Sequence, residues 1–140
     1  MRIAVIQIGY DDREPVSERV GRVADLVRRQ AGHDLVVLPE LWAPGGFSYR
    51  HWADRAEPAD GPIASAMSAA ARAAAVMVHA GAILESPAGG ARGPEGQGLG
   101  QTPLVCAAAG PTTGSHPQSN RGGAGRGGSQ AGDRRPQPRD

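Results

Sequence analysis

The chain has 140 residues and a net charge of +1; Gly and Pro make up nearly a quarter of it, and aromatic residues only 4%. This charge gives no reason to expect a polyanion or a membrane surface as partner, and a single Cys, Cys106, rules out an internal disulfide framework. No apolar run approaches the ~18 residues of a membrane span, and the N-terminus lacks a signal-peptide pattern. A cytoplasmic protein without a membrane partner is therefore expected.

The average composition hides two different parts of the chain. Residues 1–86 are rich in Val, Ile, Leu and Ala, whereas residues 87–140 carry most of the Gly and no aromatic residue. The large aliphatic residues of the second part are Leu99, Leu104 and Val105. A segment without such side chains buries too little apolar surface to offset the entropy of ordering. We predict a foldable domain over residues 1–86 and a disordered, low-complexity tail over residues 106–140.

The first three predicted elements form a strand, a helix and a second strand. An apolar, β-branched run at residues 2–8 predicts a buried strand. Residues 16–31 repeat apolar side chains at helical spacing, with Ser17 as the expected N-cap and Gly32 as the expected residue that ends the helix. Residues 34–39 are again apolar and predict a second buried strand.

A loop, a second helix and a third strand follow. Residues 40–60 contain several Gly and Pro and predict a loop, after which Pro62 begins a helix. Residues 76–84 predict the third strand. Strands that alternate with helices indicate an α/β fold with a parallel or mostly parallel sheet. Three strands and two helices would leave one face or edge of that sheet uncovered.

Glu40 directly follows the second predicted strand. Open α/β sheets place ligands and catalytic groups at the carboxyl ends of their strands. A carboxylate held there, partly out of water, could act as a general base. The alternative is a solvated glutamate that begins a turn, and position alone favours that alternative.

Four segments, in order and properly spaced, resemble the opening of the nitrilase, or carbon–nitrogen hydrolase, superfamily. They are residues 4–7 (AVIQ), 34–42 (DLVVLPELW), 56–62 (AEPADGP) and 78–85 (VHAGAILE). The first is similar to the family's opening strand, which ends in Gln, and the second to its strand ending in Pro-Glu. The third and fourth resemble the link into its second helix and its third strand. The match fades after residue 86 and continues weakly to about residue 105.

The resemblance implies the N-terminal part of an α-β-β-α sandwich and a Glu-Lys-Cys triad that hydrolyses non-peptide carbon–nitrogen bonds. In such a triad the thiolate attacks an amide or nitrile carbon, the Glu is the general base, and the Lys stabilises the developing charge. Only Glu40 carries over, because the chain contains no Lys and an Arg is a poor geometric substitute. No cofactor or metal is implied.

Cys106 is not expected to be the nucleophile. The family's nucleophile lies well beyond the Lys motif, on a tight turn between a strand and a helix. Residues 101–105, which precede Cys106, instead resemble the family's fourth strand. A buried or merely exposed thiol is the expected role.

The histidines and the aromatic residues after Glu40 give weaker indications of a functional site. His79 lies among apolar residues and is expected to be a core histidine. Metal-ligand spacing is absent among His33, His51, His116 and Cys106. The loop after Glu40 holds an aromatic group that either shapes a substrate pocket or packs over the sheet edge: Trp42, Phe47, Tyr49 and Trp52.

The tail leaves two readings open. Residues 121–128 have the look of an RGG-type nucleic-acid segment, although the modest charge argues against a nucleic-acid partner. A Gly-, Arg- and Pro-rich tail without large apolar residues is also what a GC-rich gene yields in a shifted frame. Reading the underlying DNA tests this hypothesis: the neighbouring frame after about residue 105 should encode a Lys motif and a later Cys.

The sequence therefore predicts a truncated carbon–nitrogen hydrolase that is inactive as written, with a small amide or nitrile as the substrate of a complete site. Whether this chain is an enzyme stays open. The alternative is a small non-catalytic binding module with an RGG-like tail. Half a sandwich would expose apolar surface, so a homo-oligomer is also expected.

Overall fold

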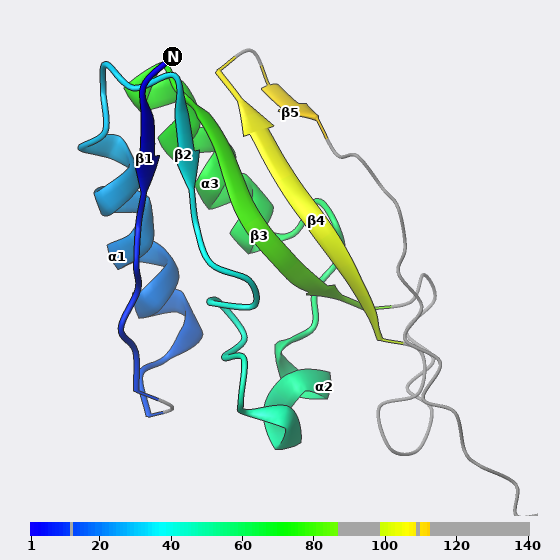
Figure 1. Cartoon of the computed structure of the whole chain (residues 1–140). Helices are drawn as coiled ribbons and strands as arrows, with labels where there is room; N and C mark the ends of the chain where they lie inside the picture. The colour runs from blue at the N-terminus through cyan, green and yellow to red at the C-terminus, as the bar shows by residue number, and fades with distance from the viewer. Residues whose placement is uncertain (12, 87–98, 109, 113–140) are drawn as a thin grey trace, which may run out of the picture.

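Five strands form one sheet in the order β1-β2-β3-β4-β5 in the computed structural model (Figure 1). The structure describes residues 1–11, 13–86, 99–108 and 110–112. The strands are β1 Ile3–Val5, β2 Leu35–Val37, β3 Met77–Glu85, β4 Gly100–Ala107 and β5 Gly110–Thr112. The first three are parallel, whereas β4 and β5 each run antiparallel to the preceding strand. The prediction of a mostly parallel sheet is confirmed for the βαβ part of the chain.

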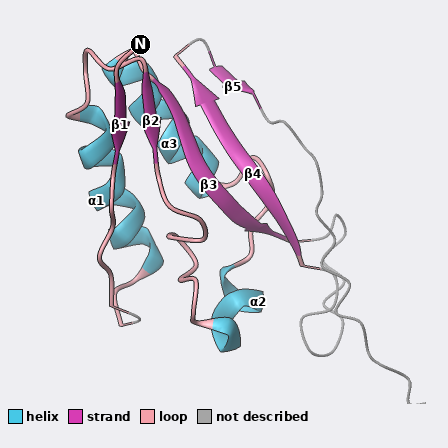
Figure 2. Ribbon diagram, viewed as in Figure 1, coloured by secondary structure: helices cyan, strands magenta, loops and turns pink. Residues whose placement is uncertain are grey.

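Two helices of thirteen residues each, α1 (Val16–Arg28) and α3 (Pro62–Ala74), cover the same face of the sheet (Figure 2). The loop between β2 and α3 contains two short helices, η1 (Tyr49–His51) and α2 (Trp52–Arg55), which the sequence did not indicate. None of the helices among the described residues is long and apolar enough to cross a membrane.

The two expected caps of the first helix are wrong. Pro15 occupies the N-cap position of α1 without a side-chain cap, and its carbonyl accepts the first helical hydrogen bond, from Arg19 N–H. Ser17 therefore lies inside the helix. Gly32 has a φ of +89°, but it lies in the turn beyond the end of α1 at Arg28. In contrast, Pro62 begins α3 as predicted, since its fixed φ and missing N–H suit a first helical turn.

The core lies between the sheet and the two helices. Ala4, Val36, Val78 and Cys106 are paired across β1 to β4 and point toward it. Val23 and Val27 of α1 and Met67, Ala70 and Ala71 of α3 meet them there, all with no exposed surface. The apolar stripe predicted for the first helix is thus the stripe that is buried.

The opposite side of the sheet carries a second apolar surface, which we call the open face. Successive strand residues point to opposite sides, so the neighbours of the core residues lie on this face. They are Ile3, Val5, Leu35, Val37, Met77, His79 and Val105. Val5 is 78% exposed, Met77 48% and Ile3 47%. Among the described residues, the helices therefore cover one sheet face only.

The boundary predicted for the tail is placed too early. Cys106 and Ala107 belong to β4, and Gly110–Thr112 form β5. A short edge strand needs backbone hydrogen bonds more than large side chains, which is why an apolar count did not reveal β5. Residues 113–140, including the RGG-like residues 121–128, lie outside the described residues.

The start of α3 is fixed by Glu57. Its Oε1 accepts a hydrogen bond of 2.8 Å from Ile63 N–H, and its own backbone bridges to the end of β3. Burial raises the pKa of Glu57, and this outweighs the lowering effect of the hydrogen bonds from the Ile63 and Ala64 backbones. The Glu57 carboxylate thus accepts a hydrogen bond from the first turn of α3, but its negative charge is poorly solvated.

We predict that Glu57→Gln stabilises the chain near pH 7, whereas Glu57→Ala destabilises it by about 1 kcal/mol because the cap is lost. The amide keeps an oxygen acceptor without a charge. Because the folded pKa is raised, ionisation of Glu57 opposes folding. The protonated Glu57 carboxyl contributes to the free energy of unfolding. This contribution is fully present below the unfolded pKa of about 4.3, and it is lost as the pH rises through the folded pKa.

Urea unfolding of the natural chain and of Glu57→Gln at pH 4 and pH 7 measures this effect. The advantage of the glutamine variant should grow from pH 4 to pH 7. An advantage that shrinks as the pH rises would contradict the assigned cause.

Candidate functional site

Glu40 opens the turn that follows β2, at the carboxyl edge of the parallel strands. Leu38 N–H donates to His79 O at 2.9 Å, so β2 stays paired with β3 almost up to this turn. The Glu40 side chain is exposed. The expectation of a partly buried carboxylate is therefore wrong for the described residues, because the turn carries the side chain past the sheet edge into solvent.

The peptide before Glu40 is packed directly against β3. The pairing of β3 with β4 shifts register between His79 and Ala82, and Gly81 lies in this bulge with a φ of +70°. A Cβ on Gly81 would lie 3.1 Å from Glu40 Cα and closer still to the Pro39 carbonyl oxygen. Only glycine allows this approach, so the bulge sets the position of the Glu40 backbone.

The residues after Glu40 anchor the turn from the other side. Leu41 has a φ of +49°, a left-handed conformation that costs a non-glycine residue roughly 1 kcal/mol. Trp42 is 1% exposed, and its Nε1–H donates to Ala80 O at 2.9 Å. The buried indole holds the turn against the same bulge of β3. Glu40 is thus fixed between two contacts with one strand.

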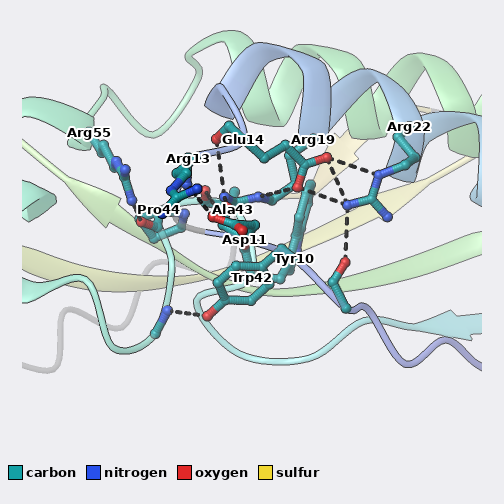
Figure 3. A network of polar contacts seen from close by, with 12 residues as sticks. Tyr10, Asp11, Arg13, Glu14, Arg19, Arg22, Trp42, Ala43, Pro44 and Arg55 are labelled. Carbon is teal, nitrogen blue, oxygen red and sulfur yellow. Dashed lines mark hydrogen bonds and ion pairs between the residues drawn. The ribbon is translucent and has the colours of Figure 1, made fainter.

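A buried arginine ties this turn to the loop after β1. Arg19 of α1 is fully buried and uses all five of its N–H donors (Figure 3). Nη1 donates to the carbonyls of Trp42 and Ala43, at 3.2 and 3.0 Å. Nη2 donates to the carbonyls of Asp11 and Glu14, at 2.9 and 3.2 Å, and Nε donates to the Glu14 carboxylate at 3.1 Å.

Tyr10 and Glu14 complete this network. The Tyr10 ring lies 4.3 Å from Arg19 Cζ, and its hydroxyl accepts a hydrogen bond from Gly46 N–H at 2.8 Å (Figure 3). Partial burial acts to raise the pKa of Glu14, but the hydrogen bonds and charges of Arg22 and Arg19 outweigh it and hold that pKa below its ordinary value. The ionised Glu14 therefore adds to the free energy of unfolding at neutral pH, and this stabilisation is lost as the pH falls through the folded pKa of Glu14.

Cys106 lies far from Glu40. It pairs with Val78, which pairs with Val36, and Glu40 follows Val36 by four residues, roughly 13 Å along an extended chain. The Cys106 thiol faces α3, where Ser68 Oγ donates to Sγ at 3.4 Å. Burial raises the pKa of Cys106, which lowers its thiolate fraction. The structure does not bring the thiol and the Glu40 carboxylate together.

The aromatic residues after Glu40 divide between the two expected roles. Trp42 is buried in packing, and the half-buried Trp52 donates its Nε1–H to Gly45 O at 2.9 Å. In contrast, Phe47 and Tyr49 are 85% and 64% exposed and help line a surface hollow of about 240 Å³ formed by residues 47–51. This hollow belongs to one short segment, and Glu40 is not among the residues that line it.

The expectation for His79 is wrong. It lies half-buried on the open face rather than in the core, because the alternation of β3 points Val78 and Ala80 inward. Its Nδ1 accepts from Gly81 N–H at 3.4 Å. Among the residues that the structure describes, no three His, Cys, Asp or Glu side chains lie together as metal ligands.

Two residues that position Glu40 were missed by the sequence reasoning. Arg19 interrupts the apolar stripe of its helix, and Gly81 lies inside an apolar strand. Both are recognised signals, since a charge on an apolar face demands partners and a strand glycine often marks a bulge.

Gly81→Ala is expected to destabilise the chain by about 2–4 kcal/mol, because the methyl group meets backbone atoms that cannot move without breaking the Glu40 turn. Gly21→Ala is the matched control: it lies on the exposed side of α1 with open space around a Cβ, and should stabilise by about 0.5–1 kcal/mol. Thermal unfolding followed by circular dichroism measures both. A Gly81→Ala variant that unfolds at the same temperature as the natural chain or at a higher one would contradict the close approach assigned to the bulge.

Arg19→Lys is expected to cost about 3–5 kcal/mol although the charge is kept. An ammonium group has three donors on one atom and cannot reach carbonyls on two loops, so buried acceptors lose their partners. Arg28→Lys is the control, because its ion pair with Asp25 is exposed and worth at most about 0.5 kcal/mol. Denaturant unfolding of both variants should differ clearly; a tolerated Arg19→Lys would contradict the five-donor account.

Comparisons with known proteins identify the family of the chain. A family model described as carbon-nitrogen hydrolase matches residues 2–124. A 2-oxoglutaramate amidase from Paenarthrobacter nicotinovorans is 37% identical over 82 residues, which cover 59% of this chain and 28% of the amidase. The chain thus spans little more than a quarter of that relative's length.

Two solved structures share the fold. One is a CN-hydrolase superfamily protein from Xanthomonas campestris with an arsenic adduct in its active site. It has a TM-score of 0.60 and 25% identity, and the match covers 77% of this chain and 37% of that protein. The other is a member of branch 10 of the nitrilase superfamily from Saccharomyces cerevisiae. It has a TM-score of 0.61 and 19% identity, and the match covers 82% of this chain and 42% of that protein. With most of its residues matched by the family model, the chain belongs to the carbon–nitrogen hydrolase family.

Proposed function

We propose that this chain supplies the general base, Glu40, of a carbon–nitrogen hydrolase site and does not complete that site by itself. The observation that carries the proposal is the position of Glu40. It stands at the carboxyl edge of the parallel strands, solvent-accessible, on a backbone fixed by Gly81, Trp42 and Arg19. A fixed, solvent-accessible carboxylate at this edge is suited to taking a proton from a nucleophile or from water.

The substrate class proposed for the complete site is a small amide. The amidase relative acts on an amide according to its name, and its similarity covers 59% of this chain. Amide hydrolysis in this scheme needs a nucleophile, a base and a group that stabilises the developing oxyanion. Glu40 fits the second role, and nitriles remain the alternative substrate class.

The other two roles are unfilled in residues 1–140. The sequence contains no Lys, and its one thiol, Cys106, is buried against α3, away from the strand ends at which Glu40 lies. A base without a nucleophile gives little rate enhancement, because the members of a catalytic triad act as a unit. We therefore propose that the 140-residue chain lacks amidase activity.

The first test is an assay of the purified chain with 2-oxoglutaramate and a simple nitrile, followed by ammonia release. Release at the rate of a protein-free blank is expected for the natural chain and for Cys106→Ala alike. Turnover that depends on Cys106 would disprove the proposed inactivity.

The second test isolates the role of Glu40. In a chimera, residues 1–86 replace the matching segment of the amidase relative, so that a complete site is present. Glu40→Gln in an active chimera should lower kcat by at least about 10³-fold with little change in thermal stability. Glu18→Gln, an exposed glutamate of α1, is the matched control and should retain activity. A Glu40→Gln chimera that keeps full activity would refute the general-base role.

A further inference from the structure

The loop after Glu40 forms a surface hollow at the end of the sheet toward which the parallel strands run. Its volume is about 240 Å³, and its lining residues are Phe47, Ser48, Tyr49, Arg50 and His51. Pockets for drug-sized ligands have volumes of roughly 300–1,000 Å³, so this hollow suits a smaller molecule. Figure 1 shows α2, which directly follows the lining segment, beyond the carboxyl ends of β2 and β3. The hollow and Glu40 therefore lie at the same end of the sheet.

Side chains hold the backbone that leads from the Glu40 turn into this hollow. The carbonyls of residues 42–45 each accept a hydrogen bond from a side chain, and the Gly46 N–H donates to one. The side chains are Arg19, for residues 42 and 43, Arg55 and Trp52, for residues 44 and 45, and Tyr10, for Gly46. A loop fixed in this way loses little conformational freedom when a ligand binds to it.

The hollow itself has a fixed floor and a fixed aromatic wall. Ser48 is buried, its N–H donates to Gly45 O at 3.1 Å, and its carbonyl accepts from His51 N–H at 2.9 Å. The Tyr49 ring lies 4.8 Å, between centroids, from the Trp52 ring, which is itself bonded to Gly45 O. Much of the Tyr49 ring nevertheless remains exposed. The hollow thus offers ordered aromatic surface to a ligand.

Arg50 gives the hollow its positive charge. None of the lining residues is acidic, and in the described part of the chain no hydrogen bond or ion pair of the Arg50 side chain is found. In contrast, Arg19, Arg22 and Arg55 donate to carbonyl or carboxylate oxygens of the chain. A guanidinium with unused donors can bind a carboxylate through two parallel hydrogen bonds.

We propose that Arg50 is a specificity-determining residue that binds a carboxylate group of the substrate. The substrate class is then a small amide that also carries a carboxylate. This inference rests on the amide hydrolase site proposed above and deepens it. The carboxylate lies against Arg50, and the aliphatic part of the substrate contacts Phe47 and Tyr49. A single charged contact in an open hollow is partly screened by solvent, so a dissociation constant of about 1–10 mM is expected.

Titration of the 140-residue chain with succinamate, followed in two-dimensional amide NMR spectra at constant ionic strength, tests the proposal. Succinamate is a small amide with a carboxylate, and butyramide has a methyl group in place of that carboxylate. Saturable shifts at residues 47–51 are expected with succinamate. Butyramide should bind at least about fivefold more weakly, because it offers Arg50 no charged partner.

Arg50→Gln should weaken succinamate binding at least about fivefold and leave the chain folded, because the Arg50 side chain is exposed. Arg29→Gln is the matched control, since Arg29 is an exposed arginine at the end of α1; its succinamate binding should equal that of the natural chain. Three results would each overturn the proposal: no succinamate shifts at residues 47–51, butyramide binding as tight as succinamate binding, or equal weakening by both variants.

This binding test and the test of Glu40 have separate outcomes. The NMR titration requires no turnover, so a Glu40→Gln chimera that keeps full activity refutes the general-base role and leaves the titration result standing. Conversely, a failed titration refutes carboxylate recognition by Arg50 and leaves the role of Glu40 to the chimera.

Discussion

The burial of one guanidinium group constrains the whole carboxyl edge of this sheet. Arg19 has no contact with solvent, and a charge in that position persists only if every donor is paired. The five acceptors come from two separate loops, one after β1 and one after β2. Because one rigid fork must satisfy both, the two loops have a single relative position. Glu40 lies on one of them, and its location follows from this constraint.

The backbone strain in the Glu40 turn persists because contacts with the rest of the fold hold the turn in place. A left-handed Leu41 and a glycine bulge in β3 are both unfavourable in isolation. They persist because Trp42 is buried with its N–H bonded to β3 and because Arg19 holds the following carbonyls. Local backbone strain persists where the surrounding structure holds the backbone through several independent contacts. Here the contacts of Trp42 and Arg19 hold the Glu40 carboxylate at the strand ends.

The two faces of the sheet lead to different properties of the chain. One face is sealed by α1 and α3, with side chains such as Val36 and Val78 fully buried. The other face carries apolar side chains without a cover among the described residues. The chain spans only part of its hydrolase relatives, and an exposed carboxylate at the sheet edge and an uncovered apolar face are both consistent with that.

The sequence by itself determined the first three strands, the two long helices and the position of Glu40 after the second strand. These features are local: apolar periodicity, a proline at a helix start and a Pro-Glu after a strand are visible within short windows. The helix caps, β5, the outward His79 and the exposure of Glu40 were decided only by the tertiary structure. They depend on contacts between distant segments, such as Gly81 against Pro39 and Arg19 against Trp42, and no local pattern encodes which segments will meet.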